Sequence, residues 1–406
     1  MASITQSDRV PGPVYWLALG AFAIGTEGFM ISPLLPSLAS DLGVSIQHAG
    51  QLVTVFAFAY GISSPVLTAL TGGVNRRSLL LGSMIAFALS NLLAFVANSF
   101  WSLMAARVLL ALSAGLFVPG SNALAGSIAM PERRGLAIAV VNAGITIAIA
   151  LGVPLGAIVG YKLGWRMTFA GVALLSSIAA AGVFFGVPKG IGDGVPTATI
   201  GERIRVGVRP IVLVTLLTTT LWATGAYTVY TYLSPLLTSL TGLQGMQISV
   251  VMFMWGFAAA IGVFSGGALS DRFGPARVIV PALALSGLGF FSLAVDARVL
   301  SPSAALWPAL SAVVIWGLTH WAFYPAQQSL LIGISGVKVA GIALSLNASF
   351  MYIGFSLGAA LGGVTLAHGS TNDLGLVAGL AETCAVILTL LIHGRSPQGA
   401  VSRTIA

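Results

Sequence analysis

Long apolar runs alternate with short polar segments along this chain. Each run is roughly 20 residues long, which is the length of a helix that crosses the hydrocarbon core of a bilayer. The runs do not alternate apolar and polar positions as barrel strands do, so the pattern predicts membrane-spanning helices. Twelve spans are predicted, at roughly 14–36, 50–71, 78–97, 101–127, 136–160, 166–187, 210–238, 248–269, 277–295, 305–334, 339–366 and 374–393.

The composition indicates that lipid is the main solvent of the fold. Hydrophobic residues make up 57% of the chain and charged residues only 7%, whereas a soluble domain carries about 25% charged residues. The formal net charge of +8 would suit nucleic acid, but the cations lie in short loops rather than in one basic patch, so we expect no nucleic-acid partner. The single cysteine, Cys384, excludes a disulfide framework and a cysteine-based metal cluster.

Enzyme motifs do not account for the chain. It has no phosphate-binding loop of the Gly-x-x-x-x-Gly-Lys-Ser/Thr type, so direct ATP drive is not supported. Residues 354–358 match the serine pattern of hydrolases, but they lie in a long apolar span rather than in a strand-to-helix turn. We therefore expect no enzyme, no cofactor and no metal site.

Basic residues lie mostly on one side of the predicted membrane. Lys162, Arg166 and Arg298 fall on one side, Arg107 falls inside a span, and every other Lys and Arg falls on the opposite side. Because positive loops are retained in the cytoplasm, this pattern predicts that both termini are cytoplasmic. The N-terminus has no cationic region leading into a short apolar core with a cleavage site, so we expect no cleavable signal.

The chain also repeats itself. Residues 32–38 read SPLLPSL and residues 234–240 read SPLLTSL. An alignment without gaps further pairs Phe117 with Phe323, Pro119 with Pro325, Gly135 with Gly341, Gly152 with Gly358 and Gly156 with Gly362. Each half holds six spans, and because that number is even the halves have the same orientation.

These features predict the fold class and its division. We expect an all-α integral membrane protein of twelve transmembrane helices, in which two six-helix bundles are related by pseudo-two-fold symmetry. The bundles are residues 1–187 and 209–406, and a polar cytoplasmic linker at 188–208 joins them. A duplicated, apolar chain of this kind is typical of a transporter whose halves rock around a central site.

Short motifs carry a resemblance to a known family. Residues 267–274 read GALSDRFG, which resembles the loop signature between the second and third helices of a half in the major facilitator superfamily. Residues 72–77, GGVNRR, are a degenerate copy. Two further spans resemble motifs of its drug:proton antiporter-1 group. In span 4 the residues are Arg107, Ala111, Ala114 and Gly115, and in span 5 they are Gly144, Gly152, Pro154 and Gly156.

The resemblance implies a fold, a place and an activity. It implies the major facilitator fold, the bacterial cytoplasmic (inner) membrane, and alternating-access efflux of drugs, sugars or nucleosides driven by the proton gradient. It also implies a gate at the loop motifs, for which the candidate residues are Gly72, Asn75, Arg76, Gly267, Asp271, Arg272 and Gly274. Gly152, Pro154 and Gly156 are the candidate helix-packing residues.

Physical chemistry gives these motif residues definite tasks. Gly274 permits a tight turn, and Asp271 with Arg272 can pair with a neighbouring helix end to hold one face closed. Asn75 stands where the acid is expected, and an asparagine can cap a helix but cannot form an ion pair. The small residues of span 5 let helices approach closely, either as static packing or as a moving hinge.

Glu27 is the sharpest chemical signal. A carboxylate near the centre of a bilayer is costly unless it is protonated, paired or facing water. Counted at about 1.5 Å per residue, Glu27 and Arg107 lie at similar depth and can meet. In related exporters an acid of the first span and an arginine of the fourth line the central cavity, which implies proton coupling here; the alternative is a structural ion pair. Glu382 in span 12 is a weaker candidate, expected to be a protonated or locally bonded structural acid.

The cargo is expected to contact polar and aromatic side chains of the central spans. Aromatic faces with a few amides suit a planar, partly apolar or weakly cationic molecule, and they also suit a sugar. His320 is interpreted either as a packing residue or as a proton carrier. The candidate substrate-binding residues are Asn122, Asn142, Tyr227, Tyr230, Trp255, His320, Trp321, Tyr324, Gln328 and Asn347.

The function predicted from the sequence is proton-coupled efflux of a small organic molecule, such as a drug, a sugar or a nucleoside-like metabolite. A facilitator or symporter for a sugar or nucleoside is the alternative within transport, and a polytopic membrane enzyme or lipid-handling protein is the alternative from another class. The expected partners are the substrate, protons and the lipid bilayer, and we expect a monomer.

Overall fold

The regular elements that the structure describes are helices. The computed structural model describes residues 10–189 and 198–393, and every regular element in these ranges is helical. The first half contains α1 (Pro13–Asp41), α2 (Ile46–Leu70), α3 (Arg76–Phe95), α4 (Phe100–Ile128), the short turn η2 (Pro131–Arg133), α5 (Arg134–Ile147), η3 (Ala148–Gly152), α6 (Val153–Leu163) and α7 (Trp165–Gly186). After α8 (Ile200–Gly207), the second half contains α9 (Pro210–Tyr230), α10 (Leu233–Thr241), α11 (Met246–Phe273), α12 (Ala276–Val299), α13 (Pro302–Ser335), η4 (Val337–Val339), α14 (Ala340–His368), η5 (Thr371–Asp373) and α15 (Leu374–His393).

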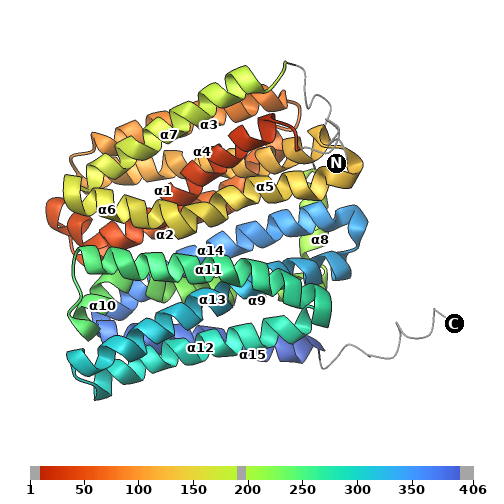
Figure 1. The fold of residues 1–406 in the computed structure, drawn as a ribbon. Helices are drawn as coiled ribbons and strands as arrows, with labels where there is room; N and C mark the ends of the chain where they lie inside the picture. Colours follow the sequence, from red (N-terminus) through yellow and green to blue (C-terminus); the bar gives the residue numbers. More distant parts are fainter. Residues whose placement is uncertain (1–9, 190–197, 394–406) are drawn as a thin grey trace, which may run out of the picture.

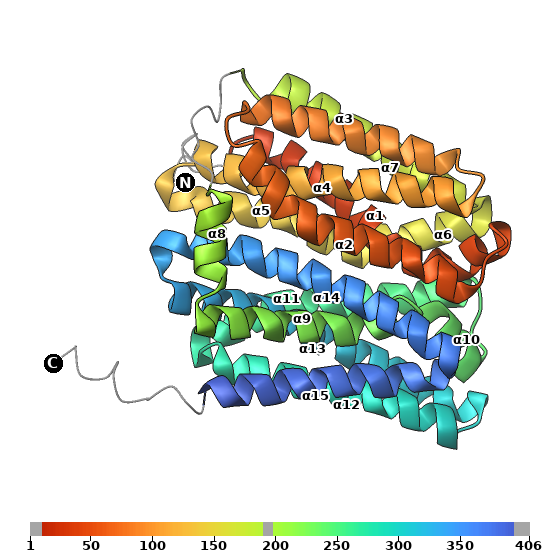
Figure 2. The same cartoon turned by 180° about the vertical axis from the view of Figure 1, so that it is seen from behind.

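Within the described ranges, twelve helices are long and apolar enough to cross a membrane, with α5, η3 and α6 forming one of them. This confirms the predicted fold class. Helices α1–α7 gather into one bundle and α9–α15 into a second beside it (Figure 1). Helix α8 lies across the ends of both bundles, on the face formed by α2 and α14 (Figure 2). We call the end where α1 begins and α15 ends the terminal end, and the other the opposite end.

The sequence predicts one continuous helix at 210–238 for the seventh span. The structure shows two helices there instead. The span breaks at Thr231 and Tyr232, between α9 and α10. Pro235 explains the break, because a proline has no N–H to donate to the carbonyl four residues earlier and its ring clashes with that carbonyl. The carbonyl concerned belongs to Thr231.

The fifth span also departs from a regular helix. Residues Ala148–Gly152 form a π-helical turn, η3, inside the expected span 136–160. Pro154, two residues after Gly152, cannot donate to the carbonyl of Ala150, so the turn widens at this point. The π turn packs against the second half, where a side chain on Gly256 would place its Cβ 2.4 Å from the carbonyl oxygen of Ile149.

Candidate functional site

Close packing of α1 on α5 and η3 positions Glu27. A Cβ on Gly144 would lie 2.2 Å from the carbonyl oxygen of Ala18, and one on Gly152 would lie 2.1 Å from Oγ1 of Thr26. Only glycine allows these approaches. The small residues of span 5 therefore fix the backbone directly beside Glu27.

Glu27 forms a fully buried ion pair with Arg107. The contact joins Arg107 Nη1 to Glu27 Oε1, and both side chains are 0% exposed. Arg107 also donates from Nε to the carbonyl of Leu52 at 3.2 Å, and its guanidinium lies 4.1 Å from the ring centroid of Phe56. Helices α1, α2 and α4 thus meet at one charged site in the first half.

The pair leaves polar capacity unused. Glu27 Oε2 and Arg107 Nη2 are buried and have no hydrogen-bond partner among the described residues. Buried polar atoms without partners are rare in folded proteins, because their desolvation is not compensated. Ring contacts lead from the pair to the second half: Phe56, which the Arg107 guanidinium contacts, lies 6.3 Å from the Tyr60 ring, and Tyr60 stacks on Tyr352 of α14 with centroids 3.7 Å apart. The charged site therefore faces the other bundle.

The side of the second half that faces the pair is aromatic. Tyr227 stacks on Phe355 with ring centroids 3.7 Å apart, and Phe29 of α1 meets both rings edge to face. His320 stacks on Trp222 with centroids 4.0 Å apart and planes 13° apart. Further members of this aromatic cluster, joined by ring contacts, are Tyr230, Trp255, Trp316, Trp321, Phe323 and Tyr324.

A polar network that the sequence analysis missed lies beside the cluster. Gln327 donates from Nε2 to the carbonyl of Thr215 at 2.8 Å and to Thr219 Oγ1 at 3.1 Å. The Thr219 hydroxyl donates to Asn347 Oδ1 at 2.7 Å. The predicted substrate-binding residue is its neighbour, Gln328, but Gln327 is buried whereas Gln328 is half-buried. The helical period through buried His320 and Phe323 could have indicated that position 327 faces inward.

The candidate substrate residues do not all share one surface. Asn142 is exposed and Asn122 half-buried, and Asn122 Nδ2 donates to Asn142 Oδ1 at 3.3 Å. Tyr324 is half-buried near Gln328 and Asn347. The structure thus brings together the aromatic candidates of α9, α11 and α13, and it places the asparagine pair separately on α4 and α5.

At the opposite end the two halves are joined by hydrogen bonds. Ser32 donates to the carbonyl of Tyr230, and Gln47 Nε2 donates to the carbonyl of Leu366 at 3.2 Å. Tyr232 of the second half packs against Gly50 of the first half. A Cβ added to Gly50 would lie 2.0 Å from the hydroxyl oxygen of Tyr232. Nearer the middle, Ser356 donates to the carbonyl of Thr54 at 2.9 Å. The protein is therefore closed at the opposite end in this conformation.

The loop motifs lie at the terminal end. Gly274 ends α11 with φ of 86°, a left-handed conformation that suits glycine, and Asn75 caps α3 by accepting from the N–H of Ser78 at 3.0 Å. Asp271 and Arg272 are exposed, and the ion pairs found in the described part of the chain do not include them. Their role as a latch stays a prediction.

Glu382 is enclosed on the inner face of α15. Its side chain is 0% exposed and lies against Gly225 of α9 and Gly287 of α12, where an added Cβ would sit 3.2 and 3.3 Å from it. Neither carboxyl oxygen has a hydrogen-bond partner among the described residues. The sequence predicts this acid to be either protonated or locally hydrogen-bonded, and local hydrogen bonds are not seen in the part of the chain that the structure describes.

Twelve spans in two bundles, with a buried charged site facing an aromatic one, define a polytopic helical membrane protein of the transporter class. The chain belongs to the Major Facilitator Superfamily, whose sequence profile matches residues 17–359 and 215–404. This confirms the resemblance seen in the loop motifs, and it points to a transporter rather than an enzyme. It is an integral membrane protein.

Individual relatives agree with this assignment. The chain is 34% identical over 374 residues to a chloramphenicol resistance protein of Streptomyces lividans, covering 90% of this chain and 92% of that protein. It is 32% identical over 395 residues to the inner membrane transport protein YdhP of Escherichia coli strain K12, covering 96% and 98%. The crystal structure of a mutant of the nucleoside transporter NupG has the same fold, with a TM-score of 0.71, 12% identity, and coverage of 94% of this chain and 99% of that one.

Proposed function

We propose that this protein is a proton-coupled exporter that exchanges protons for a small organic molecule across the bacterial inner membrane, with both termini cytoplasmic. The observation that carries the proposal is the Glu27–Arg107 pair, which is fully buried and has one oxygen and one nitrogen without hydrogen-bond partners in the described part of the chain. A structural ion pair gains most when all its polar atoms are satisfied. A pair that must take up and release a proton needs a free position on the carboxylate.

The hydrogen bonds at the opposite end support one step of the proposed cycle. With cytoplasmic termini, closure of the outer end through Ser32 and Tyr230 corresponds to the inward-facing step. We assign the deprotonated form to Glu27 in this state, because it is paired with Arg107. A proton on Glu27 would leave the Arg107 guanidinium buried without a counter-charge, which is unfavourable in a low-dielectric interior. Proton uptake therefore belongs to the outward-facing state, in which water reaches the pair.

Cargo and proton then alternate at one place. The aromatic cluster and the pair face each other across the two halves, and Phe29 of α1, two residues after Glu27, contacts the rings of Tyr227 and Phe355. A planar, partly apolar molecule that stacks on these rings gains dispersion and ring contacts. When it binds, it contacts the second half and the Glu27–Arg107 pair of the first half together. We propose that this contact favours release of the proton inward before the cargo leaves outward.

The test uses purified protein in liposomes with chloramphenicol as the first compound, because a relative is a chloramphenicol resistance protein. An antiporter accumulates compound in the lumen when the lumen is acidic. A symporter needs an alkaline lumen, and a facilitator only equilibrates the compound. We expect lumen-acidic gradients to drive accumulation and Glu27→Gln to abolish it. Uphill transport that persists in Glu27→Gln contradicts the proposal, as does transport that follows the opposite gradient.

A further inference from the structure

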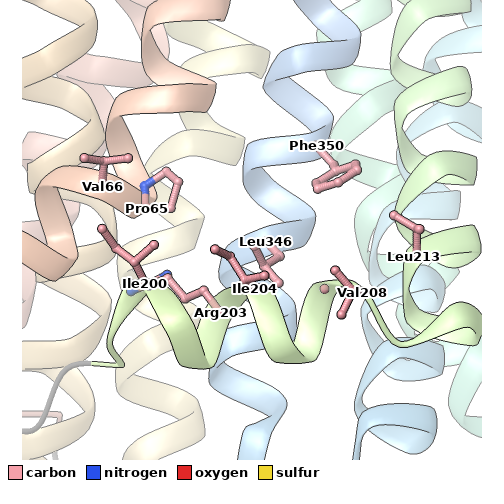
Figure 3. Close-up of a pocket in the computed structure, with 10 residues that line it drawn as sticks. Pro65, Val66, Ile200, Arg203, Ile204, Val208, Leu213, Leu346 and Phe350 are labelled. Carbon is pink, nitrogen blue, oxygen red and sulfur yellow. The ribbon is translucent and has the colours of Figure 1, made fainter.

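A groove at the terminal end lies between the two halves. It encloses about 300 Å³, far more than the roughly 30 Å³ that one water occupies in the liquid. Pro65 and Val66 of α2 form one wall, Leu346 and Phe350 of α14 form another, and α8 closes the third side (Figure 3). The walls therefore come from the first half, the second half and the segment between them.

The groove is apolar because of the sequence of α8. Ile200, Ile204 and Val208 follow each other at a spacing of four, which places them on one face of a helix. These side chains line the groove and remain 43, 58 and 62% exposed. Three uncovered aliphatic side chains in a row are unfavourable in water and favourable against hydrocarbon. Helix α8 thus has the character of an interfacial helix whose apolar face meets acyl chains.

A cation lies at the base of the same groove. Arg203 lines it, is only 7% exposed, and donates from Nη1 to Ser345 Oγ at 2.8 Å. Among the described residues no carboxylate forms an ion pair with it. Burial lowers the pKa of Arg203, because desolvation disfavours the charged guanidinium. An anion beside the guanidinium would offset that cost, and Arg205 on the same helix adds a second, exposed cation.

We propose that this groove binds one anionic phospholipid, with an acyl chain between α2 and α14 and the phosphate beside Arg203. The place suits a lipid, because α8 lies across the ends of the spans, where headgroups meet their chains (Figure 2). Movement of the two halves would change the distance between the walls. The lipid therefore stabilises the conformation in which the walls stand as they do here.

The experiment measures lipid retention by native mass spectrometry of the purified full chain, with phosphatidylglycerol and phosphatidylcholine offered in turn. Ile204→Trp fills the groove from α8, Val66→Phe fills it from α2 of the first half, and Arg203→Gln removes the cation. Leu288→Trp and Arg277→Gln are matched controls, since both residues are exposed on α12. Thermal unfolding of each variant shows that it is folded. No transport is measured, so the result is independent of the proposed function.

We expect wild type to retain one phosphatidylglycerol per chain. Filling the groove should weaken its binding, and Arg203→Gln should weaken it by about tenfold, as expected for the loss of one charge-assisted contact. Both controls should bind as wild type does. Equal binding of the two lipids by wild type overturns the proposal, and so does unchanged retention in Ile204→Trp and Val66→Phe. A dimer that covers the groove and excludes lipid overturns it as well.

Discussion

The hydroxyl of Tyr230 donates a hydrogen bond to the carbonyl of Phe29 at 2.9 Å, from the second half to the first. That carbonyl is free because Pro33, four residues later, has no N–H to donate to it. The reverse exchange occurs next to it, where Ser32 donates to the carbonyls of Tyr230 and Thr231, and Pro235 leaves the second of these free. Prolines of the two repeated motifs thus supply acceptors, and side chains near those motifs supply donors, so the duplicated sequence closes the opposite end on itself.

Removing one of these bonds should open the opposite end. In Tyr230→Phe the Phe29 carbonyl loses its donor, at a cost of about 1 kcal/mol, which is about a fivefold change in the ratio of closed to open states. Pulsed electron resonance between spin labels on α1 and α10 measures that ratio. We expect a larger long-distance population than in wild type.

The control for this variant is Tyr15→Phe, because Tyr15 lies near the start of α1, at the terminal end, and is 57% exposed. It should leave the distance distribution unchanged. If Tyr230→Phe and Tyr15→Phe give the same distribution, the bond to Phe29 does not hold the end closed.

The two partners of the buried ion pair should respond unequally to neutralisation. Glu27→Gln leaves a guanidinium that cannot lose its proton and has no counter-charge, so we expect a loss of about 3–5 kcal/mol in the free energy of unfolding. Arg107→Gln leaves a carboxyl group that can take a proton and become neutral, so its loss should be smaller. Chemical unfolding in detergent micelles measures both.

The double variant Glu27→Gln, Arg107→Gln completes this cycle. It buries two neutral amides in place of two charges, so it should be more stable than Glu27→Gln alone, with a coupling energy of about 1–3 kcal/mol. Strictly additive losses would show that the charges do not interact. None of the three variants should drive uphill transport.

Gly152 should tolerate no side chain. In Gly152→Ala the new methyl group would lie 2.1 Å from Thr26 Oγ1, so Thr26 must rotate or α1 must move away from η3. We expect a loss of about 1–3 kcal/mol, which is typical of overpacking, together with reduced transport, because Thr26 precedes Glu27. Gly171→Ala in α7 is the control, since nothing lies within 4 Å of its added Cβ. It should be neutral or stabilising, and equal behaviour of the two variants would contradict the packing argument.

The sequence predicted the features that depend on local pattern. Apolar run length predicted the twelve spans, and counting residues along spans 1 and 4 brought Glu27 and Arg107 to the same depth, where the structure pairs them. Asn75 was expected to be able to cap a helix, and it does. These properties follow from helical rise and from side-chain chemistry alone.

Features that depend on how helices turn toward each other were not predicted. Gln327 and Gln328 differ by one position, so a rotation of about 100° decides which of them bonds Thr219. Pro235 accounts for the break at Thr231 by a local rule, but nothing local indicates that Ser32, a residue of the other half, donates to the freed carbonyl. Spacing along the chain contains no information on such contacts between halves until the bundles are placed.

Helix α8 should lose stability in acid. Glu202 accepts hydrogen bonds from the N–H and hydroxyl of Thr199, at 2.8 and 3.0 Å, and these bonds hold its pKa below the ordinary value of 4.5. A lowered pKa in the folded state means that the contribution is fully present above pH 4.5 and is lost as the pH falls through the folded value. Hydrogen exchange of the α8 peptide, corrected for the intrinsic rate, should therefore accelerate below that pH in wild type. Glu202→Gln should remove this pH dependence, and a wild-type exchange profile that stays flat in acid would contradict it.

Glu382 should prove neutral and separable from proton coupling. Both of its oxygens are buried without partners among the described residues, so the charged form would face the full desolvation cost, and the protonated acid is the form that fits between Gly225 and Gly287. Replacing a buried polar group that makes no bonds by an apolar one of similar size is nearly neutral. Glu382→Leu should therefore change the free energy of unfolding by less than about 1 kcal/mol, and Glu382→Gln should keep the wild-type dependence of uptake on the pH gradient. Glu382→Lys, which introduces a charge at the same place, should fail to fold.

If Glu382→Gln abolishes uphill transport as completely as Glu27→Gln, then α15 carries a proton of the transport cycle and the neutral structural role is wrong.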